Sequence, residues 1–154
     1  MPRAVEVNLQ DPRLRLEEAS VSRLFHFLDE GLEQFGVGPG ALDIAFVDER
    51  TCCSLHEAFF HDPSLTDVMT FTGSPEDGHL GDLAICPAYA AEHAADFGHT
   101  FADELTLYLV HGWLHLAGLD DRDANHRAQM RSAERAIMAA LRAQGLIISA
   151  RWMP

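Results

Sequence analysis

The sequence predicts an α+β protein in which helices pack on one small, mostly parallel sheet. Segments with strand and helix patterns alternate in the first half of the chain, a strand pair follows, and the last third has helical spacing of apolar residues. The chain has 154 residues, of which 47% are hydrophobic, enough for one domain with its own core. We therefore expect residues 1–154 to form a single domain with four strands and about five helices.

The first half of the chain is predicted to run strand, helix, strand, helix. Residues 3–10 and 41–48 alternate apolar and polar side chains, as a strand with one buried face does. Between them, apolar residues over 16–35 follow helical spacing, and Gly36 ends this helix. Residues 53–60 have the pattern of a short helix.

The second half is predicted to hold two strands and three helices. Short β-type segments at 66–72 and 81–86 flank a loop rich in turn-forming residues. A helix with proline at its first position is expected over 87–98, and the last helix over 123–144. Between these two helices lies a third, over 101–117, which carries the most informative pattern in the sequence.

The helix over 101–117 is predicted to be buried and central. Thr100 and Asp103 can form a capping box at its start, and Gly118 can end it. A helix without a solvated face belongs in the interior, and here the apolar residues are Leu105, Leu107, Tyr108, Leu109, Val110, Trp113, Leu114 and Leu116. Histidines in such a helix are costly unless a partner satisfies them.

Two histidines near the end of this helix predict a metal site. His111 and His115 are four residues apart, so their imidazoles project from one side of the helix. A catalytic zinc ion takes three protein ligands and keeps one open position. Gly118 lets the chain turn back and bring Asp121 to the same ion. Two core histidines bonded to backbone are the usual explanation of a bare HxxxH, but burial, the glycine and the carboxylate favour one Zn²⁺ held by these three residues.

The residue after the first histidine argues against a zinc peptidase. Peptidases with the HExxH motif carry their general base as a glutamate at this place, and the sequence has Gly112 there. The three cysteines, Cys52, Cys53 and Cys86, contain no CxxC pair and are expected to be reduced thiols. Because no segment resembles a signal peptide or a membrane span, we expect a cytoplasmic protein without a membrane partner.

The charge of the chain is segregated. The formal net charge is −13, which by itself argues against a nucleic-acid partner. Arg127, Arg131 and Arg135, however, repeat every four residues on the last helix and form a basic stripe. Arginine side chains at this spacing suit the phosphates of RNA, although a solvated helix face gives the same pattern.

Three motifs resemble one known family. "HGWLHLAGLDD" (111–121) resembles the HGxLHLxGyDH signature of the YbeY-type endoribonucleases of bacterial rRNA maturation. "TDVMTF" (66–71) is similar to that family's TDVLSF strand, and "GDLAIC" (81–86) to its GDIxIS/C strand. The resemblance covers about residues 40–140 and implies a zinc-dependent hydrolase that cleaves single-stranded RNA. It further implies action at the 3′ end of 16S rRNA and in ribosome quality control.

Two positions depart from the family pattern. Asp121 stands where the family has a third histidine, and Phe60 aligns with its usual arginine. A carboxylate binds zinc well, but it lowers the net charge of the site by one and so makes a bound metal a weaker electrophile. An arginine would contact a phosphate or stabilise the transition state, so its absence bears on catalysis more than on metal binding.

Three further acids are candidate site residues, each with an ordinary structural alternative. Asp120 matches the family's aspartate and is predicted to act with His111 and His115 in catalysis, by orienting a histidine or the water; capping the last helix is the alternative. Glu104 is a candidate supporting residue two turns before His111, or a first-turn acid. Asp82 either lines the cleft or has a structural role in a turn.

The sequence thus favours a metal-dependent endoribonuclease over two alternatives. One is a ribosome-assembly or RNA-binding factor that keeps a metal for folding and cuts RNA little, and the other is a zinc peptidase. The sequence leaves open whether small-subunit ribosomal proteins or a ribosome-associated GTPase take part.

Overall fold

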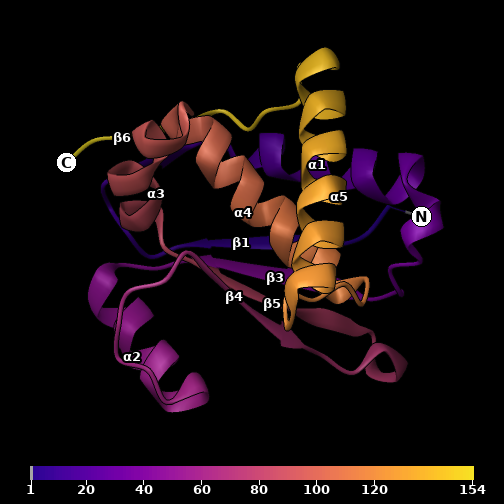
Figure 1. Ribbon diagram of the computed structural model, residues 1–154, viewed down its shortest axis with the longest axis horizontal. Helices are drawn as coiled ribbons and strands as arrows, with labels where there is room; N and C mark the ends of the chain where they lie inside the picture. Colours follow the sequence, from indigo (N-terminus) through magenta and orange to yellow (C-terminus); the bar gives the residue numbers. More distant parts are fainter. Residues whose placement is uncertain (1) are drawn as a thin grey trace.

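A computed structural model describes residues 2–154 of the protein (Figure 1). Its central element is a four-stranded mixed sheet. The strand order is β1-β3-β5-β4. Strands β1/β3 and β3/β5 pair in parallel, whereas β4 and β5 are antiparallel. The bounds are β1 Val5–Leu9, β3 Ala41–Phe46, β4 Val68–Thr72 and β5 His79–Ile85. The predicted α+β class with one mostly parallel sheet is confirmed.

Most helices cover one face of this sheet. In Figure 1, α1, α4 and α5 lie on one side of the strands and α2 lies on the other. The five α-helices of the described residues are α1 Glu18–Gly31, α2 Glu49–Phe60, α3 Pro87–His93, α4 Phe101–Leu116 and α5 Ala124–Ala143. Three short 3₁₀ turns are η1 Glu33–Phe35, η2 Pro75–Asp77 and η3 Ala94–Phe97. None of the helices within residues 2–154 has the length and apolarity needed to cross a membrane.

Helix α4 is the buried centre of the core, as the sequence predicted. Thr100 accepts a hydrogen bond from the Asp103 amide, and the Asp103 carboxylate accepts one from the Thr100 amide, so the capping box is present. Gly112 faces Leu83 of β5 so closely that a Cβ would lie 2.7 Å from the Leu83 Cδ2 atom. A glycine here therefore allows the helix to approach the sheet.

Two short strands, β2 and β6, were not predicted from the sequence. β2 (Leu14–Leu16) pairs antiparallel with β6 (Ala150–Trp152), which tethers the C-terminal segment beside the start of α1. Because Leu14–Leu16 is used in this pairing, α1 begins at Glu18 and not at residue 16. Helix α2 begins earlier than predicted, because Asp48 caps it by accepting a hydrogen bond from the Thr51 amide.

Candidate metal centre

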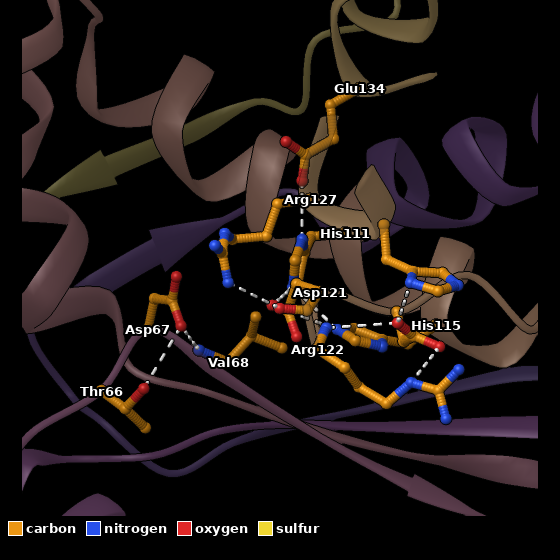
Figure 2. Close-up of polar contacts among 11 residues, drawn as sticks. Thr66, Asp67, Val68, His111, His115, Asp121, Arg122, Arg127 and Glu134 are labelled. Carbon is orange, nitrogen blue, oxygen red and sulfur yellow. Dashed lines mark hydrogen bonds and ion pairs between the residues drawn. The ribbon is translucent and has the colours of Figure 1, made fainter. Parts of the chain in front are cut away.

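Three side chains converge at the C-terminal end of α4 (Figure 2). The Nε2 atoms of His111 and His115 lie 3.0 Å apart. An Asp121 Oδ2 oxygen lies 3.9 Å from Nε2 of His111 and 4.0 Å from Nε2 of His115. Ligands of a tetrahedral zinc ion at ~2.05 Å are separated by about 3.3 Å. Small side-chain rotations would therefore bring all three donors to one ion, and the residues present fit a zinc site.

The turn after α4 brings the carboxylate to the histidines. Gly118 has a φ of 100°, a conformation that favours glycine, and the Leu119 amide donates to the Leu114 carbonyl. The chain then enters α5, where Asp123 accepts a hydrogen bond from the His126 amide and caps the helix. Asp121 lies in the turn between α4 and α5, so its position follows from the local turn that Gly118 predicted.

Glu134 on α5 fixes the orientation and tautomer of His111. Its Oε2 oxygen lies 2.6 Å from Nδ1 of His111, and the Glu134 side chain is almost fully buried. Burial favours the neutral ring, but the hydrogen bond to Glu134 and nearby carboxylates outweigh burial and raise the pKa of His111. With its proton held on Nδ1, the ring directs the Nε2 lone pair towards His115 and Asp121.

The second histidine is biased towards its neutral form. Burial and the neighbouring His111 lower the pKa of His115. Two neutral rings whose Nε2 lone pairs face each other at 3.0 Å would repel, so this arrangement calls for a proton or a cation between them. A metal ion satisfies both lone pairs and the carboxylate together.

The three residues lie in a groove of about 950 Å³. Arginines of α5 line one side of it, and Arg127 also donates from Nη1 to the Asp121 carbonyl at 3.5 Å. Asp67, immediately before β4, also lines the groove and accepts a hydrogen bond from the Val68 amide (Figure 2). The predicted stripe of Arg127, Arg131 and Arg135 therefore faces the same groove as the metal ligands.

Aromatic side chains also line the groove. Phe60 is half exposed, and its ring centroid lies 5.7 Å from that of His56. Tyr89 and His93 form a second pair, with ring centroids 4.1 Å apart. Such rings are surfaces on which unpaired bases can stack.

Asp120 and Glu104 have partners other than the three donors. Asp120 turns back towards Arg122, accepting hydrogen bonds from its amide at 3.2 Å and forming an ion pair with its Nε at 3.0 Å. The histidine that it faces is His126, 3.8 Å away, and the last helix is capped by Asp123 instead. Glu104 is buried and bonded to His99 at 2.7 Å, so the structure gives it a different histidine partner from the one considered in the sequence analysis.

Asp82 lies on the far face of the sheet from the groove. Its neighbour Leu83 packs in the core cluster that includes α4, and alternate side chains of a strand point to opposite faces. An Asp82 Oδ2 oxygen lies 3.3 Å from Nε2 of His79 on that face. This differs from the expectation that Asp82 lines the cleft, because the strand face on which it lies could not be decided from the sequence.

Glu134 is a residue of the site that was not predicted from the sequence. The sequence contains an indication of this role. Glu134 falls on the apolar stripe of α5, between Met130 and Met138, where a charged side chain requires a buried partner. Its partner His111 is 23 residues away, and the spacing alone did not identify it.

Comparison with known proteins identifies the family of the chain. The family model described as "Endoribonuclease YbeY" matches residues 6–142. The chain is 34% identical over 137 residues to an Endoribonuclease YbeY of Thermobifida fusca, covering 82% of this chain and 86% of that protein. It is also 34% identical over 151 residues to one from Renibacterium salmoninarum, covering 89% and 92%.

A solved structure shares the fold. The solution structure of TM1509 from Thermotoga maritima superimposes with a TM-score of 0.54 and 25% sequence identity, covering 92% of this chain and 94% of that one. The resemblance seen in the three sequence motifs is thereby confirmed over most of the chain. The chain belongs to the YbeY endoribonuclease family.

Proposed function

We propose that the protein is a zinc-dependent endoribonuclease specific for single-stranded RNA, acting in maturation of the 16S rRNA 3′ end and in ribosome quality control. Membership of an endoribonuclease family supports hydrolysis of RNA. The observation that carries the metal dependence is the convergence of His111, His115 and Asp121 in a groove lined by arginines. The 16S rRNA and quality-control roles rest on the family resemblance.

In this proposal the side chains of the groove have separate tasks. His111, His115 and Asp121 hold one Zn²⁺, and Glu134 keeps the proton of His111 on Nδ1. When bound, the ion supplies Lewis acidity towards a phosphoryl oxygen and lowers the pKa of a water molecule. The arginines of α5 hold the flanking phosphates, and the aromatic rings stack unpaired bases. A duplex has no unpaired bases to stack, so single strands are favoured.

Removing the metal is the direct test of this function. We expect labelled single-stranded RNA to be cut by purified protein, cleavage to stop after dialysis against a chelator, and Zn²⁺ to restore it. Products are resolved on a denaturing gel, with a duplex of the same sequence as the comparison substrate. Cleavage that continues in metal-free protein, as verified by elemental analysis, would contradict the metal dependence.

Replacing Arg131 and Arg135 together by alanine is expected to weaken RNA binding and its salt dependence. Each phosphate contact to a single strand contributes about 0.7 to the slope of log K against log salt, so the loss of two lowers it by about 1.4. Filter binding over a salt series measures this. The double variant Arg15→Ala/Arg23→Ala removes the same charge from β2 and α1, outside the groove, and its slope is expected to remain that of the wild type.

One observation favours a second candidate, an RNA-binding assembly factor with little catalysis. Phe60 offers a stacking surface in the groove but supplies no positive charge to a transition state, and Asp121 makes a bound ion less electrophilic. In that case the chelator experiment would show RNA binding without cleavage at any zinc concentration. A zinc peptidase is disfavoured because Gly112 occupies the place of its general base.

A further inference from the structure

A row of carboxylates crosses the second face of the sheet. Asp43 on β3 stands directly opposite Asp82 on β5, and Glu6 on β1 stands opposite Asp43. Like charges at opposed positions of neighbouring strands repel each other. Among the described residues, the imidazole of His79 is the only basic side chain within 4.0 Å of the Asp43 or Asp82 carboxylate. The row therefore concentrates negative charge on this face of the sheet.

A β-bulge places His79 on the same face as the two aspartates. Residues three apart on a regular strand point to opposite faces, so His79 and Asp82 would normally be separated. Here Ala41 pairs with His79 and Leu42 with Gly81, which leaves Leu80 as an extra residue in β5. The extra residue shifts the alternation by one, and bulges commonly redirect side chains in this way.

The imidazole of His79 is directed between the two carboxylates. Its Nε2 atom lies 3.5 Å from Oδ2 of Asp43 and 3.3 Å from Oδ2 of Asp82. That nitrogen is shielded from solvent, and within residues 2–154 it has no hydrogen-bond partner. Gly73 leaves room for the ring, because a Cβ there would lie 2.8 Å from Nδ1 of His79. One donor atom from each residue lies within 4.8 Å of the other two.

This cluster is separate from the groove. Leu42 and Ile44, on either side of Asp43, pack in the core cluster with α4, so Asp43 points to the opposite face. In Figure 1, α2 lies against one end of that face, away from the turn joining β4 and β5. The side chains of Asp43, His79 and Asp82 are 45%, 36% and 47% exposed. A ligand can reach the cluster without entering the groove.

We propose that Asp43, His79 and Asp82 form a second metal site, for a divalent transition-metal ion such as Zn²⁺ or Mn²⁺. Two carboxylates neutralise the charge of the ion, and the Nε2 lone pair of His79 supplies the third bond. Mg²⁺ and Ca²⁺ prefer oxygen ligands throughout, so the imidazole disfavours them. The ion joins β3 to β5 at the bulge and removes the repulsion between the aspartates.

Zinc stoichiometry tests this site independently of RNA cleavage. Metal-free protein is titrated with Zn²⁺ by isothermal calorimetry, and bound zinc is counted after equilibrium dialysis. We expect the variant Asp43→Asn/Asp82→Asn to bind one equivalent less than wild type, and His115→Ala also to bind one less. Glu6→Gln, which alters the same row without altering a ligand, is expected to bind as much as wild type. An unchanged stoichiometry in the double asparagine variant would overturn the proposal.

A measurement on the wild-type protein guards against variants that fail to fold. Crystals soaked in Zn²⁺ and measured at the zinc absorption edge are expected to show an anomalous peak between Asp43, His79 and Asp82. A peak at His111 and His115 without one at the second cluster would overturn the second site. Failure of RNA cleavage would leave both zinc measurements unaffected, so the two proposals fail separately.

Discussion

Replacing His115 by alanine is expected to abolish zinc binding at the end of α4 and RNA cleavage with it. The variant removes one of three protein donors, and the remaining pair, His111 and Asp121, lie on opposite sides of a turn. The loss should exceed the roughly 10- to 100-fold that follows when only a hydrogen-bond partner of a ligand is removed. Zinc affinity is measured by competition with a chromophoric chelator, and cleavage on labelled single-stranded RNA.

The Glu134→Gln variant is expected to weaken zinc binding without abolishing it. Glutamine keeps the shape of the side chain and can still accept from Nδ1 of His111, but it has no charge. Zinc affinity is expected to fall by about 10- to 100-fold, with cleavage restored at high Zn²⁺. Glu104→Gln is the matched control, because Glu104 is also buried and bonded to a histidine, His99.

Cleavage by the His115→Ala protein at the wild-type rate would indicate a contaminating nuclease or a different site.

The three donors at the end of α4 could be predicted because they are local in sequence. His111 and His115 follow from the helical repeat. Asp121 follows from the turn at Gly118, a residue that indicates a positive φ. Glu134 could not be found in this way, since its contact with His111 depends on how α5 crosses α4. The same holds for His79, whose side-chain direction is set by a bulge that strand periodicity does not reveal.

The fold was predictable to a similar extent and for similar reasons. The four strands of the sheet have clear alternation or apolar character, and α4 has a capping box that the sequence displays. β2 and β6 have three residues each and lie at opposite ends of the chain. A pairing of that kind depends on tertiary contacts, so no window of sequence contains its signal.

The Gly81→Ala variant is expected to lower the free energy of unfolding by about 2 kcal/mol and to weaken zinc binding. A Cβ at this position would lie 2.6 Å from the Phe71 carbonyl oxygen on β4 and 2.8 Å from Cδ2 of Leu116 on α4. The carbonyl belongs to backbone held in the β4–β5 ladder, so β5 or the last turn of α4 must move. Leu116 follows His115 directly, and a shift of that turn displaces a metal ligand.

Urea unfolding of the metal-free protein isolates the steric part of this effect, and zinc titration of the folded variant measures the displacement of His115. Gly38→Ala is the matched control, because a Cβ there has no heavy atom within 4 Å and its φ lies outside the left-handed range. That change should be neutral or stabilising by up to about 1 kcal/mol, since alanine restricts the unfolded chain. If both variants lose the same free energy of unfolding, the close packing of β5 against α4 does not explain the glycine at position 81. If only Gly81→Ala loses stability and zinc affinity, the position of the metal ligands depends on that packing.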